Sequence, residues 1–158
     1  MSKKSKHKKT LVNQILDKAN IKYENVFITV KEGKPGSQNN PSEIIFKTLA
    51  LSGDKTGPII GIIPVQKHLS EKKLAKISGN KKVKMIPQKE LQATTGYVHG
   101  ANNPIGIRQR HDYPIYIDQL SLSYGDIIVS AGEIGHSIKI NSQKLADFVD
   151  ARFADLIE

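Results

Sequence analysis

Hydrophobic spacing along the chain alternates between the period of a helix and that of a strand. Helical spacing and capping residues predict helices over residues 10–20, 70–77 and 88–94, near residues 41–43, and from Asn141 or Ser142 onward. Runs rich in β-branched residues predict strands over residues 23–30, 46–51, 59–65, 83–86, 113–118, 126–130 and 137–140. Helices and strands are therefore interleaved.

The last predicted helix carries an apolar face that a charged residue interrupts. The residues expected to face inward are Leu145, Phe148, Val149 and Leu156. Arg152 falls on the same face, where its stem can cover apolar surface while its head reaches water.

Several predicted strands are joined by tight turns. This mixture favours an α+β fold with a mixed sheet over a doubly wound parallel sheet. At 158 residues, the chain has the length of one domain. We expect that domain to cover residues 10–158, after a basic flexible tail over residues 1–9.

One strand contains a lysine among apolar residues. Alternation places Lys47 on the same face as Leu49 and Leu51. Such a lysine either extends to solvent or meets an anion. It is therefore an edge-strand lysine that opposes aggregation, or a cation that binds a phosphate or carboxyl oxygen.

Residues 96–106 form an uncharged segment with three glycines and one proline. Glycine permits backbone angles and close approaches that a side chain would block. The segment is either a tight connection between strands or a shaped loop whose backbone binds a ligand.

The charge pattern favours a polyanionic partner. The net charge is +9, and lysines cluster at the N-terminus and over residues 72–84. Nucleic acid is the partner that such a charge favours. Aromatic residues make up only 6% and tryptophan is absent, which argues against a stacking platform for single strands.

Other function classes lack their motifs. The glycines match neither the P-loop nor the dinucleotide spacing, and no histidine pair has metal-ligand spacing, so no metal or cofactor is expected. The absence of cysteine excludes a thiol nucleophile. His99 is either polar surface or an acid–base group. Without a signal peptide or an apolar run long enough to span a membrane, we expect a cytoplasmic protein and no membrane partner.

Several short motifs occur in an order that matches a known family. They are Lys47-Thr48-Leu49, residues 69–76, residues 79–83, Thr95-Gly96-Tyr97 with Gly100, Pro104 and Gly106, Ile117-Asp118, and Ser130-Ala131-Gly132 with Gly135. In this order, from about Leu11 to Leu156, the chain resembles the YbaK/EbsC branch of the aminoacyl-tRNA editing-domain superfamily.

This resemblance implies a mixed, largely antiparallel sheet that curls into a partial barrel and is flanked by helices. It also implies a trans-editing deacylase that clears cysteine from tRNA(Pro), and also from tRNA(Cys). Prolyl-tRNA synthetase attaches cysteine in error because a pocket discriminates poorly between amino acids of similar volume. The implied partners are the aminoacyl-tRNA and, transiently, prolyl-tRNA synthetase.

The resemblance also assigns site residues. Lys47 matches the lysine that contacts the 3′ end of the charged tRNA, with Thr48 beside it in the pocket. The residues that match the loop around the terminal adenosine and the ester are Gly96, Gly100, Pro104 and Gly106. Those that match the lining of the aminoacyl pocket are Ser130 and Gly132. The departures from common members are Asn102, Asn103 and Ile28.

The implied chemistry needs no protein nucleophile. The substrate's own thiolate attacks its ester carbonyl and releases the tRNA with a cyclic thiolactone, which is a lyase-type rather than a hydrolytic step. The catalytic contributions would come from Lys47 and from the backbone around Gly100 and Gly106, through orientation and amide donors to the oxyanion. The alternatives are a deacylase for another substrate such as Ala-tRNA(Pro), and a noncatalytic binding protein.

Overall fold

The computed structural model describes residues 8–31, 34–36 and 41–158. The predicted tail falls mostly on residues 1–7, outside this range. The elements in chain order are α1 (Leu11–Lys18), β1 (Glu24–Phe27), β2 (Thr29–Lys31), β3 (Lys34–Gly36), η2 (Ser42–Ile44), β4 (Phe46–Gly53), β5 (Gly57–Pro64), α2 (Glu71–Ser78), β6 (Val83–Met85), α3 (Gln88–Thr95), α4 (Pro104–Arg110), β7 (Ile115–Asp118), α5 (Leu120–Tyr124), β8 (Asp126–Glu133), β9 (His136–Asn141), α6 (Ser142–Val149) and β10 (Arg152–Ala154).

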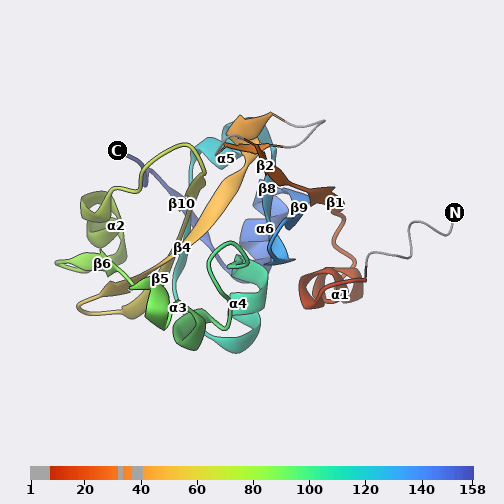
Figure 1. Ribbon diagram of the computed structural model, residues 1–158. Coiled ribbons are helices and arrows are strands. Elements are labelled where there is room, and N and C mark those ends of the chain that lie inside the picture. Colours follow the sequence, from red (N-terminus) through yellow and green to blue (C-terminus); the bar gives the residue numbers. More distant parts are fainter. Residues whose placement is uncertain (1–7, 32–33, 37–40) are drawn as a thin grey trace, which may run out of the picture.

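Two main sheets form the centre of the molecule (Figure 1). One has the order β1-β9-β8 and is antiparallel. The other has the order β10-β7-β5-β4-β6, with β7 parallel to both of its neighbours. Within the described residues, one bridge between Ile45 and Ile128 joins the sheets. The sheets therefore curl into a partial barrel, which confirms the predicted mixed, largely antiparallel fold.

On the side that faces β6, the first half of β4 has no strand paired with it in the part of the chain that the structure describes. The carbonyl of Ile45 accepts from Val65 N–H on the β5 side, at 2.8 Å, and the carbonyl of Ala50 accepts from Ile86 N–H on the opposite side, at 3.1 Å. Because bonding direction alternates along an antiparallel strand, Thr48 turns its N–H and C=O toward the same edge as Ala50. β6 pairs only with Leu51–Gly53 of β4, so this edge is not covered by a strand at Thr48.

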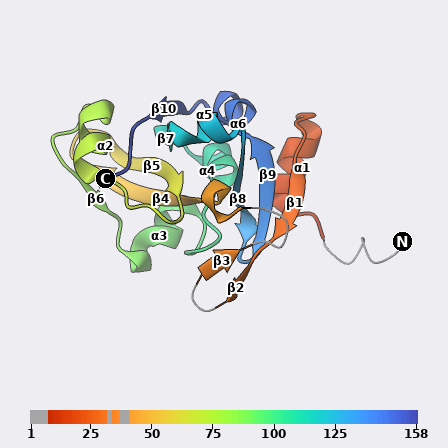
Figure 2. The same ribbon diagram turned by 90° about the horizontal axis from the view of Figure 1, so that it is seen from above.

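Each face of the larger sheet has its own core. On the inner face, residues of both sheets pack with α1, α4 and α6. On the outer face, α2 and the C-terminal segment cover Leu51, Ile59 and Ile63. Figures 1 and 2 place α1 and α2 at opposite ends of the molecule. Alternation along β4 puts Phe46 and Ala50 in the inner core and Leu51 in the outer one.

Predicted helix caps are confirmed at both ends of the chain. Thr10 caps α1 by accepting from Asn13 N–H, and Asn13 returns a bond to the Thr10 amide. Asn141 caps α6 by accepting from Lys144 N–H at 3.0 Å. In the described part of the chain, no helix is both long and apolar enough to cross a bilayer.

The C-terminal prediction was wrong beyond Val149. Helix α6 ends there because Asp150 adopts a left-handed backbone with φ of 56°. Arg152 begins the unpredicted strand β10, where it is exposed and pairs with Tyr116. Leu156 is buried as expected, but in an extended segment whose amide donates to the Asp118 carboxylate at 2.9 Å. Helices α4 and α5 were also not predicted.

Candidate functional site

The glycine-rich segment connects two helices rather than two strands. Gly96 ends α3 with a φ of 88°, and a Cβ there would lie 2.7 Å from the guanidinium of Arg110. Gly100 has a φ of 91° and lies against Ile134 in the turn between β8 and β9. Both glycines are therefore required by backbone conformation, and Gly100 brings the loop next to that turn.

The second half of the predicted loop is the first turn of α4. Asn103 is the N-cap, and its Oδ1 accepts from the Gly106 amide at 2.6 Å. Pro104 occupies the first helical position, where no N–H is needed. All three residues are buried. The Gly106 amide is therefore already bonded, and the expected oxyanion donor is not available at this position.

Tyr97 packs between the loop and strand β8. A side chain at Gly106 would overlap the Tyr97 hydroxyl, and one at Gly132 would lie 3.4 Å from the Tyr97 ring. Gly132 has a φ of 99° and donates its amide to Ser130 Oγ at 3.1 Å, within an irregularity of the β8–β9 pairing. The structure thus brings Gly106 and Gly132 to the same tyrosine ring, and no pattern in the sequence predicts this role of Tyr97.

A hollow of about 260 Å³ lies where the loop faces the edge of β4. Thr48 and Ala50 contribute from the strand, and His99 and Asn102 from the loop. Asn102 is 6% exposed, and its Nδ2 donates to the Thr48 carbonyl at 3.2 Å. The open edge of β4 is therefore held to the loop by one side-chain amide.

Lys47 lies on the other side of β4. It is half-buried and lines a neighbouring hollow with His68, Glu71 and Glu158. Burial lowers the pKa of its ammonium, and among the described residues no carboxylate forms an ion pair with it. The two hollows share Leu49 and Met85 in their walls, which places them side by side. The structure thus does not put Lys47 in the same hollow as the glycine loop.

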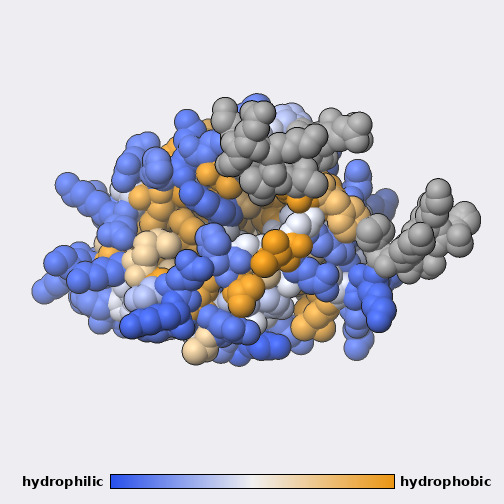
Figure 3. Space-filling model, viewed as in Figure 1, coloured by the Kyte–Doolittle hydropathy of each residue, from blue (hydrophilic) through white to orange (hydrophobic). Residues whose placement is uncertain are grey.

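Exposed lysines gather on and beside α2 and β6, two elements that border the Lys47 hollow through Glu71 and Met85. They belong to α2, β6 and the turns beside them: Lys55, Lys72, Lys76, Lys81, Lys82 and Lys84. Lys73 differs because it forms an ion pair with Asp155 at 2.8 Å. Figure 3 shows hydrophilic side chains projecting from this end of the molecule. We call these six residues the α2–β6 lysines.

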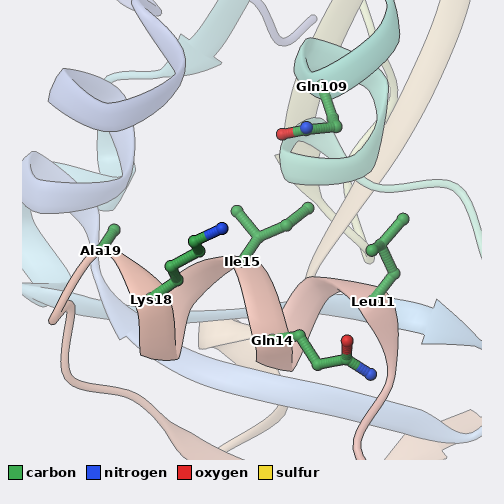
Figure 4. A pocket seen from close by; sticks show the side chains of 6 residues that line it. All are labelled: Leu11, Gln14, Ile15, Lys18, Ala19 and Gln109. Carbon is green, nitrogen blue, oxygen red and sulfur yellow. The ribbon is translucent and has the colours of Figure 1, made fainter.

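A further hollow lies between α1 and α4, away from these residues. Figure 4 shows the residues that line it, five from α1 or its C-terminal end and Gln109 from α4. None of the predicted site residues contributes to it. Among the described residues, no group of three or more histidine, aspartate or glutamate side chains is placed to hold a metal ion.

Comparison with known proteins identifies the family. Residues 36–148 match the aminoacyl-tRNA editing domain. The chain belongs to this family. It is 35% identical, over 99% of its length and 98% of the relative's, to EbsC of Enterococcus faecalis, which is named as a candidate Cys-tRNA(Pro)/Cys-tRNA(Cys) deacylase.

Solved structures share the fold of this editing domain. One is described as a candidate trans-editing enzyme for prolyl tRNA synthetase, with a TM-score of 0.77, 22% identity, and coverage of 93% of this chain and 94% of that one. Another is a scaffold used for epitope grafting by computational design, with a TM-score of 0.78, 23% identity and the same coverage. At these identities the likeness concerns the fold alone.

Asn102 and Asn103 are the site residues whose roles the sequence did not reveal. Asn103 could have been recognised, since an asparagine directly before a proline is typical of a helix N-cap followed by its first residue. Asn102 had no such signal, because its partner is a backbone carbonyl 54 positions earlier.

Proposed function

We propose that this aminoacyl-tRNA deacylase clears cysteine from mischarged tRNA(Pro), with release driven by the thiol of the substrate. The observation that carries the proposal is the hollow at Thr48, where strand edge and loop backbone surround a space without a cysteine, serine or carboxylate. The similarity to a relative named for this substrate supports the choice of cysteine.

The reaction balances without a protein nucleophile. The cysteine thiolate attacks the ester carbonyl, a C–S bond forms, and the C–O bond to the ribose breaks. The leaving 3′ oxygen takes a proton, and the thiolactone opens in water. The protein orients the thiol toward the ester. When reacting groups are well aligned, orientation lowers the activation barrier by on the order of 7 kcal/mol.

The predicted residues differ in how they fit this proposal, and Gly106 serves packing against Tyr97, since its amide is bonded to Asn103. Lys47 binds a phosphate oxygen near the 3′ end from the neighbouring hollow. Thr48 borders the hollow that we assign to the aminoacyl group, whereas Ser130 and Gly132, bonded to each other, lie outside its lining. Gly96 and Pro104 fix the ends of the loop. Transient association with prolyl-tRNA synthetase would supply the selection for tRNA(Pro), since the deacylase would meet the product as it leaves the synthetase.

Direct hydrolysis is the second candidate, because His99 lines the same hollow as Thr48. An imidazole there could deprotonate a water molecule that attacks the ester. The two mechanisms differ in what they need from the substrate, because only cyclisation requires a thiol.

The test is single-turnover deacylation of tRNA(Pro) charged with cysteine, serine or alanine. We expect cysteine to leave at least about 100-fold faster than serine, since the neutral hydroxyl is a far weaker nucleophile than a thiolate. His99→Gln should keep most of the activity, and Lys47→Ala should lose most of it while remaining folded. Equal rates for cysteine and alanine would exclude the thiol mechanism, and loss of activity in His99→Gln would favour hydrolysis.

A further inference from the structure

The side-chain oxygen of Asn102 is a buried acceptor without a partner. Asn102 Oδ1 and the hydroxyl of Ser121 are the two such side-chain atoms in the described part of the chain. The orientation of the Asn102 amide is determined by its bond to the Thr48 carbonyl, which can only accept. The nitrogen therefore faces β4, and Oδ1 is the atom left for another donor.

The position of Asn102 suggests what that donor is. Asn102 lines the hollow at the open edge of β4, and the Thr48 N–H points to the same edge. The site thus offers one acceptor and one donor side by side. A buried polar atom without a partner is unusual in native proteins and calls for a specific explanation, such as a ligand.

We infer that Asn102 recognises an N–H donor at the charged 3′ end, with Oδ1 as the acceptor and the Thr48 amide binding the adjacent ligand acceptor. Two parts of that end have a neighbouring donor and acceptor. One is the α-ammonium with the ester carbonyl, and the other is the adenine amino group with ring N1. The inference rests on the proposed function for the identity of the ligand.

Access to Oδ1 requires a small movement. The atom has less than 1 Å² of exposed surface, so a donor reaches it only when a side chain at the rim moves aside. The rim includes the exposed residues His99, Met85 and Gln88. Rotamer changes of exposed side chains are fast. Recognition therefore accompanies a rotamer change at the rim of the hollow.

The experiment is a binding cycle with stable amide-linked analogues. The parent probe is 3′-(cysteinylamino)-3′-deoxyadenosine. The second probe replaces cysteine with 3-mercaptopropanoate and so lacks the ammonium. The third replaces adenine with hypoxanthine and so lacks the adenine amino group. Dissociation constants are measured by NMR titration for wild type, Asn102→Leu, Asn102→Asp and Ser121→Ala. Ser121→Ala is the matched control. It removes the other buried side-chain atom without a partner, and Ser121 does not line the hollow.

We expect wild type and Ser121→Ala to bind one of the altered probes at least about tenfold more weakly than the parent, as for a hydrogen bond to a charged or buried group. Asn102→Leu should bind the parent weakly and discriminate against neither probe. Asn102→Asp keeps an acceptor but loses the bond to the Thr48 carbonyl, so it should restore only part of the discrimination. Loss with the mercaptopropanoyl probe assigns the donor to the ammonium, and loss with hypoxanthine assigns it to adenine; both support the inference.

Three results would overturn it: wild type that discriminates against neither probe, Asn102→Leu that discriminates as strongly as wild type, or no binding of the parent probe at millimolar concentration. Thermal unfolding confirms that the variants are folded, and Asn102→Ser replaces the leucine variant if leucine is not accommodated. The two proposals can fail separately. Absence of deacylation by wild type would contradict the proposed function, whereas the binding cycle uses probes that cannot be deacylated and tests this inference by itself.

Discussion

At the residue scale, neighbouring residues of β4 serve different parts of the site. Lys47 and Thr48 are adjacent in sequence but lie in different hollows, because successive side chains of a strand point to opposite faces. A single strand can thereby present a cation to one part of a ligand and a backbone edge to another. The shared wall at Leu49 and Met85 is the point where both parts would meet.

The lowered pKa of Lys47 predicts a pH dependence of tRNA binding. Burial disfavours the charged ammonium, so the charge is present below the lowered pKa and is lost as pH rises through it, earlier than for an exposed lysine. We expect affinity for uncharged tRNA to fall at alkaline pH in wild type. In Lys47→Arg it should persist to higher pH, because guanidinium stays charged.

Fluorescence anisotropy from neutral to alkaline pH measures this difference. The control is Lys18→Arg, which changes an exposed lysine on α1. Parallel pH curves for wild type and Lys47→Arg would show that Lys47 does not contact the tRNA.

At the element scale, helix α4 fixes the end of the loop. Its N-cap and first turn are buried, so the loop enters the helix in one defined direction. Tyr97 then fills the space between α4 and β8 that Gly106 and Gly132 leave open. The glycine at position 106 is therefore explained by packing against an aromatic ring rather than by a turn.

Removal of the α4 cap should destabilise the protein. In Asn103→Ala the Gly106 amide loses its acceptor inside the fold, and we expect the free energy of unfolding to drop by about 1–2 kcal/mol. Asn103→Ser keeps a capping oxygen and should lose less. Urea denaturation measures both, and equal losses in the two variants would indicate that side-chain volume rather than the cap is responsible.

At the scale of the whole molecule, the positive charge is unevenly placed. The α2–β6 lysines lie at the end of the molecule opposite α1, on and beside two elements that border the Lys47 hollow. A tRNA whose 3′ end enters at β4 could lay its acceptor stem along these lysines. Binding to phosphates releases counterions, which makes the affinity depend on salt.

A triple variant tests this arrangement. In Lys72→Ala/Lys81→Ala/Lys84→Ala, the slope of log Kd for tRNA against log salt should decrease by about 2–3, since each phosphate contact contributes roughly 0.9. The matched control is Lys18→Ala/Lys22→Ala near the opposite end, which should leave the slope nearly unchanged. A slope that changes equally in both variants would mean that tRNA has no preferred face.

Local signals were sufficient for most elements. The starts of α1 and α6 and the strands β4 and β5 depend on residues close in sequence, and all four elements were predicted. Short elements were missed where tertiary contacts decide them. β10 has only three residues, and it exists because β7 offers it an edge.

The features of the site also fall into those that the sequence determines and those that only tertiary contacts decide. The sequence by itself determined the alternation that places Lys47 on one face of β4, the glycines that need positive φ, and the motif order that identifies the family, because each depends on local backbone preference or on residue order. Only the tertiary structure decided that Lys47 and the loop lie in separate hollows, that Tyr97 joins α4 to β8, and that Asn102 binds Thr48 across 54 positions. Such contacts depend on which chain segments the fold brings together, and no local preference encodes them.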